Sequence, residues 1–255
     1  MPTRFVEFMR VLVPMAGDDT TPEGEQVNIY GNHVGSWNFA ATAYLNRWKV
    51  KIYYEHYFDD HSQMFFQYGR WKDGHIGLEI TFPKNRFIDT FVYEGLGTKD
   101  QTGPMLYDSF WGEFEEQISA KDNYYNHYLY QGWQHWGMGI GNPLLPGPIY
   151  NKNGQITFIS NRVLAHHIGF CGSPCQSLSY RMLLSYSRHW GTYDNPLNEI
   201  KKQFNSLFEV TYAPQQLKGW SFTVSGAMDR GSLLGNNYGG MLVIRKQGII
   251  KSGNK

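Results

Sequence analysis

The 255-residue sequence is nearly neutral, with 23 basic and 22 acidic side chains and a formal net charge of +1. This balance excludes a basic face of the kind that binds nucleic acid, and no apolar run approaches the roughly 18 residues that a transmembrane helix needs. Aromatic side chains make up 16% of the chain, with 18 Tyr, 16 Phe and 8 Trp, and this content excludes disorder. The composition therefore indicates a folded, β-rich protein.

The first residues give no sign of a secretion signal. Arg4, Glu7 and Arg10 interrupt any apolar core in the first 24 residues. We expect either a cytoplasmic protein or a fragment that has lost its leader. The segment RFVEFMRVLV (residues 4–13) is predicted to be a strand, which favours a fragment beginning inside a fold.

Alternation with a period of two is the strongest pattern along the chain. In RWKVKIYYEHYF (residues 47–58) the even positions from Trp48 to Tyr54 are apolar, and the odd positions from Arg47 to Glu55 are mostly charged. Similar segments recur at 32–45, 75–82, 177–190, 203–212, 219–228 and 238–246. We predict about ten antiparallel strands of about nine or more residues, a length that crosses a bilayer when the strand is tilted.

The connections between these segments alternate in length. Short ones are expected at Asn46, 83–85, 171–175 and 214–218, and longer ones at 14–27, 59–74, 97–155, 191–202 and 231–237. An outer-membrane barrel sorts its connections in this way, with short periplasmic turns and long extracellular loops. The fold class predicted is therefore all-β, an antiparallel transmembrane β-barrel with a periplasmic C-terminus.

The two faces of the predicted strands differ in chemistry. One face is apolar with aromatic residues near the strand ends, as expected of a lipid-facing wall with aromatic girdles. The other face is polar and suits a lumen, where Lys49, Lys51 and Arg181 either attract acidic sugars or form a salt-bridge network. The alternative is a large soluble antiparallel sheet with one face packed on a core.

The two cysteines, Cys171 and Cys175, lie in the short segment CGSPC. We predict that they are turn residues, joined in a small-loop disulfide if the compartment is oxidising. Two cysteines are too few for a structural zinc site, because the adjacent His166 and His167 would point to opposite faces of a strand. No metal and no cofactor is expected.

The longest connection, 97–155, concentrates aromatic and amide side chains in DNYYNHYLYQGWQHWGMGIGNP (residues 122–143). Flat rings stack on sugar rings and amide or imidazole groups bond hydroxyls, so an exposed or lumen-folding loop of this composition predicts a glycan-binding surface. The alternative is that the rings pack the loop into a small core of its own or a lumen plug. Residues 109–120 are predicted to form a short helix capped by Ser109. The candidate ligand-binding residues are Tyr124, Tyr125, His127, Trp133, Gln134 and Trp136.

Catalysis is not indicated. The sequence has no GxSxG elbow, no HExxH and no phosphate-binding loop, so Asp108, Glu115 or the paired histidines have no fixed geometry for catalysis. We predict that the protein is not an enzyme and has no catalytic residues.

Several motifs in fixed order resemble the Wzi-type capsule assembly family. They are YYEHYFDDHSQMF (53–65), PKN (83–85) with VYEGLGTKDQTGP (92–104), DNYYNH (122–127) with GWQHWGMGIGNPLL (132–145), and NRVLAHHIG (161–169). The resemblance runs from about Gly31 to the C-terminus.

The resemblance implies an eighteen-stranded outer-membrane barrel with a lectin-like role in attaching capsular polysaccharide to the cell surface. Residues 1–255 would then be one portion of that barrel, its C-terminal part, unless the strands close as a smaller barrel. The implied partners are capsular or surface polysaccharide, outer-membrane lipid and the capsule export machinery, with no nucleic acid. The rival functions are an outer-membrane diffusion channel, a soluble carbohydrate-binding β-sandwich and an outer-membrane hydrolase or acyltransferase.

Overall fold

The computed structural model describes residues 4–13, 33–59, 73–85, 87–101, 122–127 and 131–248. In these ranges the protein is almost entirely β-structure. The strands are β1 (Val34–Leu45), β2 (Trp48–Asp59), β3 (Gly74–Thr81), β4 (Thr90–Gly97), β5 (Gln134–His135), β6 (Met138–Gly139), β7 (Val163–Cys175), β8 (Leu178–Gly191), β9 (Pro196–Tyr212), β10 (Trp220–Gly231) and β11 (Asn237–Lys246). The helices are α1 (Phe5–Leu12) and the single 3₁₀ turn η2 (Pro148–Tyr150).

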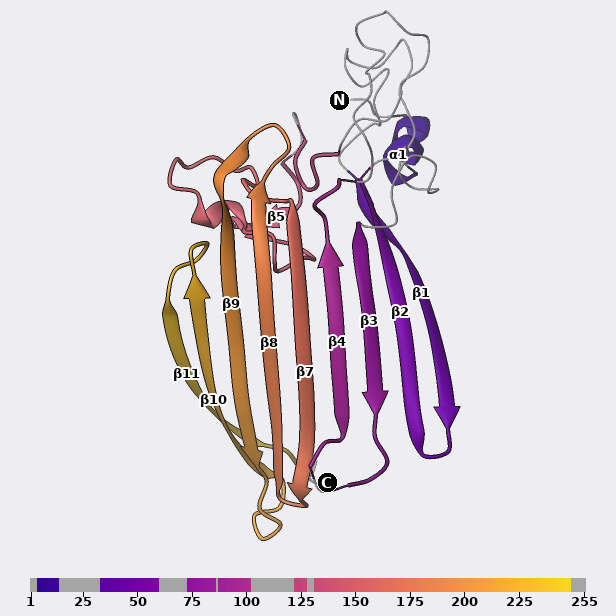
Figure 1. Ribbon diagram of the computed structural model, residues 1–255, viewed down its shortest axis with the longest axis vertical. Coiled ribbons are helices and arrows are strands. Elements are labelled where there is room, and N and C mark those ends of the chain that lie inside the picture. The colour runs from indigo at the N-terminus through magenta and orange to yellow at the C-terminus, as the bar shows by residue number, and fades with distance from the viewer. Residues whose placement is uncertain are drawn as a thin grey trace, which may run out of the picture.

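Nine strands form one sheet in the order β1-β2-β3-β4-β7-β8-β9-β10-β11, and every neighbouring pair is antiparallel. Figure 1 shows these strands side by side, with β1 and β11 at the two edges. The predicted all-β, antiparallel architecture is confirmed. The sheet has nine strands where about ten were predicted, and β1 and β11 do not pair with each other in the described part of the chain.

The prediction of a strand at residues 4–13 is wrong, because Phe5–Leu12 forms helix α1. Apolar residues at positions 5, 8, 9 and 12 also fit the helical period, and a short apolar run cannot be assigned by periodicity alone. No helix in the described ranges is long and apolar enough to cross a membrane.

Two connections predicted to be long are short. Strand β9 begins at Pro196, so only residues 192–195 join it to β8, and residues 232–236 join β10 to β11. Pro196 can begin a strand because the first residue need not donate to the ladder. The sorting of connection lengths therefore holds only for the connections that follow β2 and β4.

The two cysteines are also placed differently from the prediction. Both belong to strand β7, which continues to Cys175, and the turn to β8 is made by Gln176 and Ser177. A bulge between Gly172 and Cys175 accommodates the extra residues, so the strand continues to Cys175. Both thiols are free.

The predicted difference between the two faces is confirmed by the register. Phe39, Tyr54 and Ile76 lie opposite one another across β1, β2 and β3 on the apolar face. On the other side of the same strands, Tyr53, Gly77 and Glu94 lie opposite one another across β2, β3 and β4. We call this second side the polar face. Its row continues across the rest of the sheet through His167, Ser185, Asn205, Asp229 and Asn237.

The apolar face is not covered by any described segment of the chain. Residues more than half exposed on it are Phe39, Leu45, Ile52, Ile76, Val224, Tyr238, Leu242 and Ile244. The buried apolar cluster lies elsewhere, where the β4–β7 connection meets the start of β7. Its members are Tyr124, Tyr125, Leu145, Phe158, Val163 and Ala165.

Candidate functional site

The candidate site is a cavity of about 620 Å³ between the polar face and the described part of the β4–β7 connection. The strands contribute Ser36, Glu55, His75, Glu94 and His167 to its lining. The connection contributes mainly apolar and aromatic residues, which are Tyr124, Tyr125, Trp133, Ile140, Pro143, Leu144 and Leu145. The strands also contribute the apolar Val34, Phe58, Leu96 and Ala165, so their hydrogen-bonding groups lie among apolar side chains, the combination usual in small-molecule sites.

Hydrogen bonds fold the connection on itself and tie it to the sheet. The side chain of Asn126 bonds the backbone of Phe158 twice, as donor to its carbonyl and as acceptor from its N–H, both at 2.8 Å. The buried Asn161 donates to the carbonyl of Tyr124 at 2.8 Å. The Tyr124 hydroxyl donates to Asp73 Oδ2 at 3.0 Å, which ties the connection to the residue preceding β3.

Tyr125 has a left-handed backbone with φ of 71° and a buried ring. Its ring packs edge-on against Phe158, with 5.1 Å between the ring centroids. Its hydroxyl accepts a hydrogen bond from the backbone N–H of Asn142 at 3.1 Å. Burial raises the pKa of the Tyr125 phenol, so the hydroxyl remains neutral and fixes the segment that begins at Asn142.

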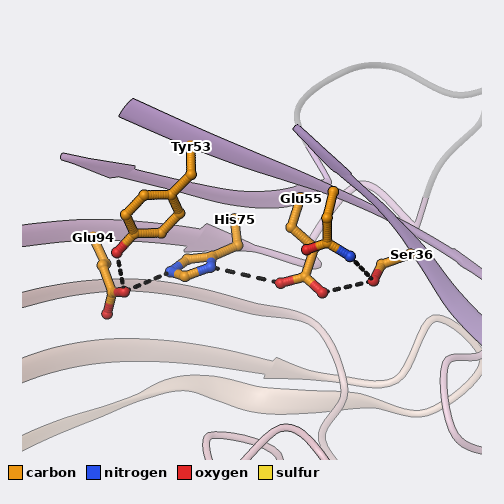
Figure 2. Close-up of polar contacts among 6 residues, drawn as sticks. Ser36, Tyr53, Glu55, His75 and Glu94 are labelled. Atoms are coloured by element: carbon orange, nitrogen blue, oxygen red, sulfur yellow. Dashed lines mark hydrogen bonds and ion pairs between the residues drawn. The ribbon is translucent and has the colours of Figure 1, made fainter. Parts of the chain in front are cut away.

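Figure 2 shows a chain of polar side chains on neighbouring strands, and four of them, Ser36, Glu55, His75 and Glu94, line the cavity. Ser36 donates to Glu55 Oε1 at 2.6 Å. The His75 ring lies between two carboxylates, with Nδ1 3.7 Å from Glu55 Oε2 and Nε2 3.5 Å from Glu94 Oε1. The Tyr53 hydroxyl donates to the same Glu94 Oε1 atom. We call Ser36, Tyr53, Glu55, His75 and Glu94 the polar chain.

The sheet register explains why these side chains meet. Glu55 lies directly opposite His75, and Gly77 lies opposite both Tyr53 and Glu94. Because Gly77 has no side chain, the Tyr53 ring can lie across it and reach Glu94 two strands away. A Cβ at position 77 would fall 2.0 Å from the Tyr53 ring.

The polar chain has a neighbour on the next strands. His167 lies opposite Glu94 in the β4–β7 pair, and its Nδ1 atom is 2.6 Å from the Ser185 hydroxyl. Farther along the row, Asn205 donates to Asp229 Oδ1 at 2.7 Å. The cavity therefore lies at one end of a row of hydrogen-bonded side chains.

The lining of the cavity contains two carboxylates and three histidines, His75, His166 and His167. Glu55 and Glu94 are its two carboxylates, and none of the described lining residues is a lysine or an arginine. The three cations noted in the sequence lie elsewhere on the polar face: Lys49 is 3.7 Å from Glu79, Lys51 lies over the Tyr53 ring, and Arg181 is 3.4 Å from Glu209.

Three of the six predicted ligand-binding residues come together at the cavity. Tyr124 and Tyr125 are buried in its apolar wall, and Trp133 packs against the same cluster. For these three, the structure matches the alternative in which the rings pack the connection into a small core.

The other three predicted residues lie outside the cavity lining. Trp136, at the tip of the β5–β6 hairpin, is 85% exposed. Gln134 accepts a hydrogen bond from the Gly137 N–H at 2.7 Å and thereby shapes that hairpin. His127 is partly buried, and its carbonyl accepts from the Gln131 side chain. The helix predicted at 109–120 lies outside the described residues.

The polar chain was not predicted as a site. Alternation places Glu55 and His75 on the polar side of their strands, but only the register brings them opposite each other. Among the described residues, no group of three or more histidine, cysteine, aspartate or glutamate side chains could hold a metal ion.

Comparison with known proteins gave no match, neither to a family model nor to a curated protein nor to a solved structure.

Proposed function

We propose that the chain is part of a Wzi-type outer-membrane barrel that binds capsular or other surface polysaccharide. The observation that carries this proposal is the two-faced sheet, in which one face is apolar and uncovered by described residues and the other carries a hydrogen-bonded polar row. In water, so large an exposed apolar face would promote association. Lipid is the occupant that such a face fits when it belongs to long antiparallel strands.

All but two of the nine strands of the sheet are long enough for this role, since β3 and β4 have 8 residues each. Strands β7 to β11 contain 13, 14, 17, 12 and 10 residues, and about 9–11 tilted residues cross the hydrocarbon core. Exposed rings near strand ends, such as Trp48, Tyr212 and Trp220, suit the membrane interfaces.

The connection after β4 is the proposed carbohydrate-binding part. It places an exposed ring, Trp136, at the tip of a short hairpin and encloses a cavity beside it. Rings and amides in this arrangement can stack on sugars and bond their hydroxyls. The proposal includes no reaction.

The test is capsule retention by cells that carry Trp136→Ala in the full-length protein. Because the Trp136 side chain is 85% exposed, its truncation should change stability by no more than about 0.5 kcal/mol. We expect capsule to be released into the medium. The matched control is Phe87→Ala, an exposed ring in the β3–β4 connection at the opposite end of the sheet, which should retain capsule. Normal retention by the Trp136 variant would contradict the proposal.

A diffusion channel of the same architecture is the second candidate. It is favoured by a smaller cavity of about 260 Å³ on the polar face, lined by residues that include Arg181, Glu209 and Thr211. Single-channel conductance in planar bilayers separates the two functions. A barrel whose polar face is covered by the folded connection should conduct little, whereas a channel should conduct steadily.

A further inference from the structure

We propose that the cavity under the β4–β7 connection selects a non-acidic sugar unit, neutral or amine-bearing, and excludes sugars that carry carboxylate, sulfate or phosphate. This inference rests on the proposed function and names the substrate class of the same site. It follows from three properties of the lining: its size and its mixture of polar and apolar side chains, its charge, and its unused hydrogen-bonding groups.

The size and shape suit a short saccharide. A volume of about 620 Å³ lies within the range of about 300–1,000 Å³ that small-molecule sites occupy. The partly exposed Trp133 ring and the wall formed by Tyr125 and Leu144 offer apolar surface to the flat side of a sugar ring. The strands opposite offer Glu55, Glu94 and their hydrogen-bonding partners.

The charge of the lining determines what can enter. The two carboxylates of the polar chain are bridged by one histidine, His75, so the trio keeps a net negative charge even when that histidine is protonated. The other two histidines of the lining, His166 and His167, contact the hydroxyls of Tyr93 and Ser185, and no described lining residue is a lysine or an arginine. An anionic sugar entering this partly enclosed space would meet like charges that water screens poorly. A neutral or cationic sugar would not.

The carboxylates retain capacity to accept hydrogen bonds. In the described part of the chain, both contacts of Glu94 fall on its Oε1 atom, which takes the Tyr53 hydroxyl and faces His75 Nε2. A carboxylate has about four lone-pair positions, so Glu94 can accept further donors through Oε2. Sugar hydroxyls and amines are donors of this kind, whereas an ionised acidic group offers acceptors only.

The opposite wall supplies a donor. The indole N–H of Trp133 is buried and has no hydrogen-bond partner among the described residues. Buried polar groups are nearly always paired, so an unpaired one beside a cavity indicates a missing acceptor. The Trp133 ring lines the cavity, so a small rotation of the indole would present this N–H to a ring oxygen, hydroxyl or acetamido carbonyl of a bound sugar. Neutral and amine-bearing sugars thus match both walls.

The test measures binding of three disaccharides to the full chain folded in detergent, followed by tryptophan fluorescence. The probes are a glucosamine disaccharide, an N-acetylglucosamine disaccharide and a galacturonate disaccharide, at one ionic strength. We expect the galacturonate probe to bind at least tenfold more weakly than either of the others. Glu94→Gln and Glu55→Gln should each reduce that ratio several-fold, because each removes one negative charge while keeping the side-chain shape.

The control is Glu209→Gln, which removes the same charge from the same face but outside this cavity, where Glu209 pairs with Arg181. It should leave the ratio unchanged, and circular dichroism checks that all variants fold. If either Glu94→Gln or Glu55→Gln fails to fold, the binding ratio measured with the other variant tests the inference. Equal or tighter binding of the galacturonate probe would overturn the inference. Failure of all three probes would overturn it as well, while release of capsule by Trp136→Ala would still support the proposed function.

Discussion

Gly77 is the position where a single methyl group tests the polar chain most sharply. Its missing side chain leaves room for the Tyr53 ring, which crosses β3 to bond Glu94. A Cβ would lie 2.0 Å from that ring, against an ordinary contact of at least 3.4 Å. The ring would have to move by about 1.4 Å or more, which is enough to break the hydrogen bond.

The expected magnitude follows from two opposing effects. A hydrogen bond to a charged group contributes about 1.5–3 kcal/mol to the free energy of unfolding. Replacing glycine by alanine inside a strand recovers roughly 0.5–1 kcal/mol. We therefore expect Gly77→Ala to lower the free energy of unfolding by about 1–2 kcal/mol. Urea titration in detergent micelles, followed by tryptophan fluorescence, measures this change.

Two comparisons make the result specific. Gly226 in β10 has nothing within 4 Å of an added Cβ, so Gly226→Ala should raise the free energy of unfolding by roughly 0.5–1 kcal/mol. In a Tyr53→Phe background the hydrogen bond is already lost, and Gly77→Ala should then no longer lower the free energy of unfolding. The reasoning is refuted if Gly77→Ala stabilises the protein as Gly226→Ala does, or costs the same in both backgrounds.

Three further predictions concern the apolar face, which we propose faces lipid, and the folded connection. Val224→Arg places a charge on the apolar face and should cost about 2–4 kcal/mol of folding free energy in liposomes. Ala227→Arg, on the other face of the same strand, should cost little. Equal effects of the two substitutions would contradict a lipid-facing wall. Phe158→Ala removes a ring that is 1% exposed. It should lower the free energy of unfolding by about 3–5 kcal/mol and make the β4–β7 connection sensitive to protease. Cleavage at the same rate as in the wild-type protein would count against the packing described. Asn126→Ala removes both hydrogen bonds to the Phe158 backbone and should lower the free energy of unfolding by about 1–3 kcal/mol. Urea titration measures this change, and an unchanged free energy of unfolding would contradict the prediction.

Strand positions and faces could be predicted from the sequence because alternation is a local property. Trp48, Val50 and Ile52 alternate with lysines, and the structure puts the two sets on opposite faces of β2. The same reasoning failed for Phe5–Leu12, since apolar residues at 5, 8, 9 and 12 satisfy the helical period as well. It also failed at Pro196, because a proline read as part of a loop can begin a strand.

The candidate site could be predicted only in part. An unusual density of aromatic residues identified the connection that contains Tyr124, Tyr125 and Trp133. Glu55, His75 and Glu94 meet because of the register between three strands. Residues 60–73 separate β2 from β3, and residues 82–89 separate β3 from β4. Local patterns carry no information on that register, since a shift of one residue would move each side chain to the other face.

The most direct test of the central claim is binding of capsular polysaccharide by the purified protein. The protein, folded in detergent, is passed over immobilised surface polysaccharide isolated from the organism that encodes it, with Trp136→Ala and Phe87→Ala run beside it. We predict that the wild-type protein and the Phe87 variant are retained and that the Trp136 variant elutes early. Elution of the wild-type protein with the unbound fraction would contradict the account.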